Sequence, residues 1–122
     1  QTVSVIDVQS HTLVATLPAG TDMTGVNFGN DGKKGYVISR GTSQVFMYDF
    51  STLEKTGQLD MGEGARLETA STSPAGTKVY VASSSNNSLY VIDVESDRVK
   101  QIKDVGNFPW GVSIYKGQNY CH

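Results

Sequence analysis

Cysteine and histidine, the side chains that most often ligate transition metals, are rare in this chain of 122 residues. There is one cysteine and there are two histidines, and Cys121 and His122 form the final pair. This pair matches the end of the Cys-x-x-Cys-His motif that attaches c-type haem, but Gln118 occupies the position of the first cysteine. A single-cysteine thioether attachment stays open, although we favour a terminal pair without a chemical role. Zinc or copper would need ligands from another chain, because stable sites use about three or four.

Three aspartates recur along the chain at a nearly constant spacing. Asp7, Asp49 and Asp93 lie 42 and 44 residues apart. Each of them ends an alternating run of β-branched and aromatic residues, and a short polar turn and a second such run follow. Aspartates at such positions accept hydrogen bonds from the N–H groups of the turn. We therefore interpret the three aspartates as caps of hairpin turns with a structural role.

The repeated phrase that carries these aspartates predicts the fold. A second phrase shares the period: GKKGYVIS begins at Gly32 and GTKVYVAS begins at Gly76. A period of roughly 40 to 45 residues with four short strands is typical of a β-propeller blade, and helical repeats of similar length need an apolar period of 3.6 residues, which is not present. The sequence therefore predicts an all-β fold made of propeller blades with four antiparallel strands each.

About three blades fit into the chain as one propeller segment. We assign residues 1–20 to an outer half-blade, 21–62 and 63–106 to two complete blades, and 107–122 to the inner strand of a further blade, with a strand over Trp110–Tyr115. Propellers usually need four to eight blades to close. We therefore expect the chain to need partners: either it is part of a longer propeller, which we favour, or several copies assemble into one ring.

Composition narrows the classes of partner. The net charge is −2, and no apolar run approaches the roughly 18 residues of a membrane span. The attraction to phosphates that dominates nucleic-acid binding is therefore weak, and we expect neither nucleic acid nor membrane insertion. The sequence begins at Gln1 without a methionine or a signal peptide, which fits a processed export product or a piece of a longer protein.

The phrases GYVISRG, VYVAS and LYVIDVESDRV resemble the YVTN-type repeats of bacterial propellers in exported and surface proteins, over nearly the whole chain. Residues Gly35–Ser71 are more specifically similar to the haem-binding propeller of cytochrome cd-type nitrite reductases and related haem-maturation proteins. The shared points are the Gly-Ala-Arg element at Gly64–Arg66, Glu68 after it, and Arg40 directly after YVIS.

This resemblance implies a cofactor and two residues that contact it. In that family an eight-bladed propeller holds a d-type haem over its central channel, and arginines at the blade rims pair with the haem carboxylates. Arg40 and Arg66 occupy two matching positions, and a guanidinium makes bidentate hydrogen bonds to a carboxylate. The alternative is that Arg40 caps a turn and that Arg66 pairs with Glu63 or Glu68 on the surface.

The sequence departs from that family at the iron ligand. The reductases carry a proximal histidine at the position that corresponds to Thr24, and Met23 beside it is expected to serve packing. His11 falls in an outer hairpin turn, and His122 is the last residue. We therefore expect no catalytic residue and no metal ligand from this segment, and an iron ligand from elsewhere if haem binds. Whether the parent protein is an enzyme stays open.

Two classes of function follow. The first is an exported, periplasmic propeller segment that binds a tetrapyrrole or belongs to a redox or haem-maturation protein. The second is a noncatalytic repeat scaffold for protein or carbohydrate, for which the polar loop Ser83–Ser88 is suitable. Asn107–Trp110 interrupts the repeat with two aromatic residues, which we interpret as packing between blades.

Overall fold

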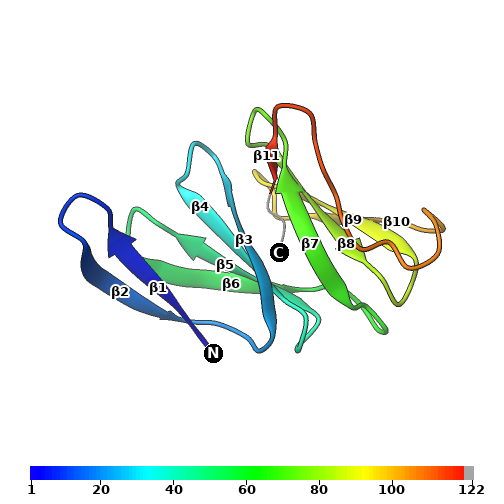
Figure 1. The fold of residues 1–122 in the computed structure, drawn as a ribbon, viewed down its shortest axis with the longest axis horizontal. Helices are drawn as coiled ribbons and strands as arrows, with labels where there is room; N and C mark the ends of the chain where they lie inside the picture. Colours follow the sequence, from blue (N-terminus) through cyan, green and yellow to red (C-terminus); the bar gives the residue numbers. More distant parts are fainter. Residues whose placement is uncertain (120–122) are drawn as a thin grey trace.

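The computed structural model describes residues 1–119, and these residues form three antiparallel sheets without a helix (Figure 1). The hairpin β1–β2 is a sheet by itself, the second sheet has the order β3-β4-β5-β6, and the third has the order β10-β9-β8-β7-β11. The strands are β1 Thr2–Asp7, β2 Thr12–Pro18, β3 Met23–Gly29, β4 Lys34–Ser39, β5 Gln44–Asp49, β6 Glu54–Asp60, β7 Leu67–Thr72, β8 Lys78–Ser83, β9 Ser88–Asp93, β10 Val99–Ile102 and β11 Gln118–Asn119. The predicted all-β fold of four-stranded antiparallel units is confirmed.

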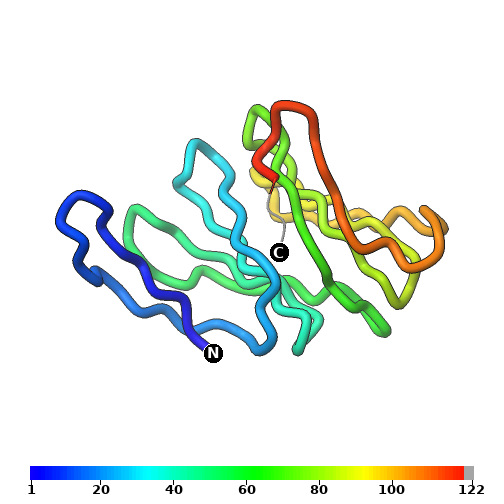
Figure 2. Tube along the Cα trace, viewed as in Figure 1, coloured from blue at the N-terminus to red at the C-terminus, as the bar shows by residue number. Residues whose placement is uncertain are grey.

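The three sheets follow one another across the molecule and do not close into a ring (Figure 2). Strands β3 and β7 are the inner strands of neighbouring sheets and lie next to each other, where Thr24 Oγ1 donates a hydrogen bond of 2.7 Å to the Glu68 carbonyl. Within residues 1–119, no helix is long and apolar enough to cross a membrane.

The repeating aspartates cap the turns, as predicted. Asp7 Oδ1 accepts hydrogen bonds from the backbone N–H groups of Gln9 and Ser10, at 3.0 and 2.7 Å. Asp49 and Asp93 accept the same pair of bonds from the residues two and three positions later. The caps satisfy turn N–H groups that have no partner in a strand ladder.

The segment after the third sheet differs from the prediction, because Trp110–Tyr115 is not a strand. Its first part runs beside β7, where Thr69 N donates to the Trp110 carbonyl and Ser71 Oγ donates to the Val112 carbonyl. Of residues 103–119, only the two of β11 pair with β7 through a regular antiparallel register. A strand ladder needs the backbone N–H and C=O groups of two neighbouring strands in register. Here, hydroxyl groups of β7 make much of the contact with residues 110–112 instead.

Apolar side chains bury the two joints between the sheets. The larger core lies between the second and third sheets and combines Ile38 and Val45 with Leu67, Val79 and Val81, all fully buried. A smaller core joins the hairpin β1–β2 to the second sheet around Leu17, Val37 and Tyr48. The three sheets are therefore held to one another by the burial of apolar surface at the two joints and not by the hydrogen bonds of a common sheet.

The larger joint depends on a close backbone approach at Gly29. A Cβ added to Gly29 would lie 2.8 Å from Val94 Cγ1 and 3.1 Å from the Gly76 carbonyl oxygen, both in turns between strands of the third sheet. We expect Gly29→Ala to lower the free energy of unfolding by about 1 to 3 kcal/mol, because the joint must open to admit the methyl group. Gly25→Ala, on the same strand, meets nothing closer than 3.8 Å and is the control in urea denaturation. Equal midpoints for the two variants would contradict the expectation.

Candidate functional site

The two arginines named from the sequence lie at the same end of neighbouring sheets. Arg40 directly follows β4, and its N–H donates to the Asp22 carbonyl just before β3, at 3.0 Å. Arg66 directly precedes β7, and its carbonyl accepts from Ser84 N just after β8, also at 3.0 Å. In each sheet the end of the second strand is thus tied to the start of the inner strand. Both arginines therefore lie at the end of the two sheets where the inner strands β3 and β7 begin.

Both guanidinium groups bind the carboxylate of Glu68 in β7. Arg40 Nη1 lies 3.0 Å from Oε2, and Arg66 Nε lies 2.9 Å from Oε1. Ser84 Oγ donates a further hydrogen bond of 2.7 Å to Oε1. The side chain of Glu68 is only 1% exposed, so these three donors replace its hydration. We call Asp22, Arg40, Arg66, Glu68 and Ser84 the arginine cluster.

Asp22 completes the cluster on the solvent side. Arg40 Nε and Nη2 donate to its two carboxylate oxygens at 2.7 and 2.9 Å, which is a bidentate arrangement. The hydrogen bond from Arg40 lowers the pKa of Asp22, and the same bond is the main reason why the pKa of Arg40 is raised. Arg40 therefore uses three of its five donors inside the cluster and is a fixed, permanently charged support.

The buried carboxylate stays ionised because its donors outweigh its burial. Burial alone would raise the pKa of Glu68, but the hydrogen bonds from Ser84, Arg40 and Arg66 together lower it below the ordinary value. Arg66 is the more accessible of the two arginines: its side chain is 51% exposed, against 25% for Arg40, and within residues 1–119 only its Nε is engaged. Its remaining donors can bind an additional anion.

The structure thus brings Arg40 and Arg66 together, as the sequence predicted, but around a carboxylate of the protein itself. The alternative pairing of Arg66 with Glu68 is present, although Glu68 is buried and not a surface partner. Sequence reasoning missed Asp22 and Ser84. The isolated acidic residue within the otherwise uncharged strand LETAST was the available signal for a buried ion pair. The role of the arginines as cofactor contacts stays a prediction.

The other candidates from the sequence do not gather here. His11 lies in the β1–β2 turn, Met23 is exposed at the start of β3, and Cys121 and His122 lie outside the described residues. Between residues 1 and 119, no group of three or more His, Cys, Asp or Glu side chains is arranged to hold a metal. The loop Ser83–Ser88 is less available for partners than its composition indicates, because three of its serines are buried: Ser83, Ser84 and Ser88.

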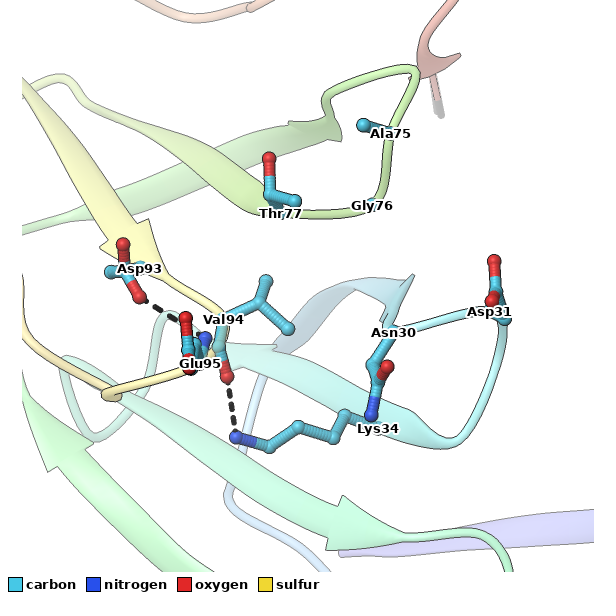
Figure 3. Close-up of a pocket in the computed structure, with 9 residues that line it drawn as sticks. All are labelled: Asn30, Asp31, Lys34, Ala75, Gly76, Thr77, Asp93, Val94 and Glu95. Carbon is cyan, nitrogen blue, oxygen red and sulfur yellow. Dashed lines mark hydrogen bonds between the residues drawn. The ribbon is translucent and has the colours of Figure 1, made fainter.

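A cavity of about 590 Å³ lies at the opposite end of the sheets, between the second and third (Figure 3). The turn Asn30–Asp31, the turn around Gly76, and the end of β9 line it. Lys34 Nζ crosses the joint here and donates to the Val94 carbonyl at 2.7 Å (Figure 3). It also donates to Asp97 Oδ1 at 2.8 Å. Because this ammonium group is already paired, we regard the cavity as part of the joint between sheets.

Solved structures share this arrangement of sheets. One is hydrazine synthase of Kuenenia stuttgartiensis, with a TM-score of 0.75 and 20% identity, over 88% of this chain and 31% of that one. Another is dihydro-heme d1 dehydrogenase NirN in complex with DHE, with a TM-score of 0.68 and 22% identity, over 97% of this chain and 24% of that one. No family model and no curated protein matches the sequence.

These likenesses define the class of fold. The sheets of this chain are blades of a β-propeller, arranged as an open arc. The chain spans about a third of the length of the first relative and about a quarter of the second. At such identities the comparison establishes the fold alone, and the chemistry has to be argued from the arginine cluster.

Proposed function

We propose that this chain is a segment of an exported, periplasmic propeller that binds an anionic tetrapyrrole of the d-type haem class, within a redox or haem-maturation protein. The observation that carries the proposal is that Arg40 and Arg66 converge where the inner strands β3 and β7 begin, and that donors of Arg66 are still accessible. The sequence resemblance and the likeness to NirN, which is in complex with DHE, support this class of ligand.

The residues have different parts in the proposal. Arg66 contacts a ligand carboxylate through its terminal nitrogens, while its Nε stays on Glu68. Arg40 and Glu68 hold Arg66 in place and do not contact the ligand themselves. A bound haem would supply redox chemistry, and this chain supplies binding and orientation. The iron ligand comes from outside residues 1–119.

Titration of haemin, a dicarboxylate tetrapyrrole, followed by visible absorption tests the proposal. We expect Arg66→Ala to weaken binding by about 1.5 to 3 kcal/mol, or roughly 10-fold to 150-fold, which is the range for a hydrogen bond to a charged group. Arg98→Ala removes an exposed arginine on the outer turn of the third blade and is the matched control. Equal affinities for the wild type and both variants would remove tetrapyrrole binding from Arg66.

A noncatalytic scaffold for protein or carbohydrate is the second candidate. It is favoured by the internal pairing of the cluster, in which two arginines face two carboxylates. In that case the guanidinium groups serve only to join blades. The same titration separates the two functions, because a scaffold would give no saturable change in the haemin spectrum.

A further inference from the structure

Asp22 is held in place by its backbone as well as by its ion pair with Arg40. Its carbonyl accepts a hydrogen bond from Arg40 N at 3.0 Å. The preceding carbonyl, of Thr21, accepts from Gly41 N at 3.0 Å and from Ser39 Oγ at 2.8 Å. Because the backbone is tied at two successive residues and the side chain is bound bidentately, the carboxylate of Asp22 is a fixed part of the arginine cluster.

Asp22 and Arg66 occupy equivalent places in neighbouring blades. In each blade, the carbonyl at this place accepts a hydrogen bond of 3.0 Å from the N–H group of the residue after the second strand. The pKa of Asp22 is lowered first by the hydrogen bond from Arg40, and the charge of Arg66 contributes as well. The carboxylate of Asp22 thus acts electrostatically on the guanidinium group that has accessible donors.

The charges within the arginine cluster cancel. Its two guanidinium groups are positive, and the ionised carboxylates of Asp22 and Glu68 are negative. Asp22 also occupies Nε and Nη2 of Arg40, and Glu68 occupies Nη1, so Arg40 offers little to a ligand. An anion at the terminal nitrogens of Arg66 is therefore attracted by one guanidinium group and repelled by Asp22. This repulsion increases in proportion to the charge of the anion.

We propose that Asp22 makes the arginine cluster selective for a single carboxylate over a doubly charged group such as a phosphate monoester. This inference rests on the proposed role of Arg66 as the contact to the ligand. A carboxylate carries one charge, and its two oxygens match the two terminal nitrogens of a guanidinium group. It therefore binds Arg66 with the least repulsion from Asp22. The cluster favours ligands whose carboxylates are set apart from one another, and it disfavours nucleotides and other phosphate esters.

Two small anions test this selectivity without a tetrapyrrole. At about pH 8, acetate carries one negative charge and methyl phosphate carries close to two. Both are titrated at constant ionic strength, so that general screening by salt does not change. The chain has three arginines, and the NMR signals of their Nε–H groups report on Arg66 separately from Arg98, which serves as the reference.

Two substitutions of Asp22 remove its charge and keep its backbone conformation. Asparagine and glycine both tolerate the positive φ of 48° at this position, so Asp22→Asn and Asp22→Gly are independent measurements of the same effect. Asp31→Asn is the control, because it changes the net charge by the same amount in the turn at the opposite end of β3.

Both substitutions of Asp22 should raise the affinity of Arg66 for acetate about threefold and for methyl phosphate about tenfold. Coulomb's law in water gives about a threefold effect for two unit charges about 6 Å apart, and the factor is squared for a doubly charged anion. Asp31→Asn should change neither affinity. Equal gains for the two anions, or no gain, overturn the proposal. It is also overturned if neither anion shifts the Arg66 signal in any of these proteins.

The haemin titration separates this inference from the proposed function. If haemin binds through Arg66 but Asp22 has no charge-dependent effect on the small anions, only the selectivity is wrong. If the small anions behave as expected but haemin does not bind, the selectivity stands and the tetrapyrrole is the wrong ligand.

Discussion

Replacing both arginines of the cluster by alanine is expected to lower the free energy of unfolding by about 3 to 5 kcal/mol, the range for a buried charge that loses its partners. Glu68 is the reason for this large effect. Its side chain is 1% exposed, and in Arg40→Ala/Arg66→Ala only the Ser84 hydroxyl would remain as a donor to its carboxylate. Urea denaturation at neutral pH measures the loss.

Two comparisons identify the cause of that loss. Adding Glu68→Gln to the double variant removes the unpaired charge, so most of the stability should return. Arg98→Ala/Lys100→Ala removes two exposed cations, one just before the outer strand β10 and one within it, and should cost little. A loss below about 1 kcal/mol in the cluster variant would mean that water hydrates Glu68, and the buried-charge explanation would be wrong.

The pH dependence of the same variants has a defined sign. The pKa of Glu68 is lowered in the folded chain, so its contribution is present above the ordinary glutamate value of 4.5 and is lost as the pH falls through the lowered value. Without the arginines, only the hydrogen bond from Ser84 would oppose the effect of burial, which raises the pKa of Glu68. The difference in stability between the wild type and the double variant should therefore shrink as the solution is acidified.

The second large effect is expected at Asp97, at the other end of the joint between the second and third blades. Its Oδ1 accepts hydrogen bonds from Lys34 Nζ at 2.8 Å and from the Tyr36 hydroxyl at 3.1 Å. Tyr36 is fully buried, and its pKa is raised first by burial and then by Asp97. Because two hydrogen bonds to a charged acceptor are lost, we expect Asp97→Ala to lower the free energy of unfolding by about 3 kcal/mol.

His11→Ala is the control for the backbone at this position. Asp97 and His11 both have positive φ values, 57° and 55°, at corresponding places in their turns. His11→Ala therefore reports the cost of alanine in that conformation without the loss of the two hydrogen bonds. If the two variants lose equal stability, the bonds from Lys34 and Tyr36 contribute nothing measurable. Thermal or urea unfolding of both proteins provides the comparison.

The strands and their caps were predictable because their signals are local. Short runs of β-branched and aromatic residues predict strands, and Asp7, Asp49 and Asp93 accept hydrogen bonds from N–H groups within three residues. The burial of Glu68 was not predictable in this way. Its partner Arg40 is 28 residues distant, in another blade, and only the stacking of blades brings the two together.

Two expectations from the sequence differ from the structure because they depend on residues that are distant in the sequence. The sequence around Trp110–Tyr115 has a strand pattern, but the structure describes no second strand of that blade with which it could form a ladder. The serines of Ser83–Ser88 have the composition of an exposed loop, yet Ser84 donates to Glu68 and is buried beside it. Composition does not report which polar groups are needed inside.

The turn after each repeating aspartate carries a different residue at one equivalent position, and this distinguishes the blades from one another. Four residues after Asp7, Asp49 and Asp93 stand His11, Leu53 and Asp97, all with φ between 55° and 57°. Leu53 lines an apolar groove of about 420 Å³ between the hairpin β1–β2 and the second blade, whereas Asp97 accepts hydrogen bonds from Lys34 and Tyr36 of the preceding blade. The equivalent turn position thus makes an apolar contact in one joint and charged hydrogen bonds in the other. A blade moved along the array would meet the wrong neighbour, so these repeats are not interchangeable modules.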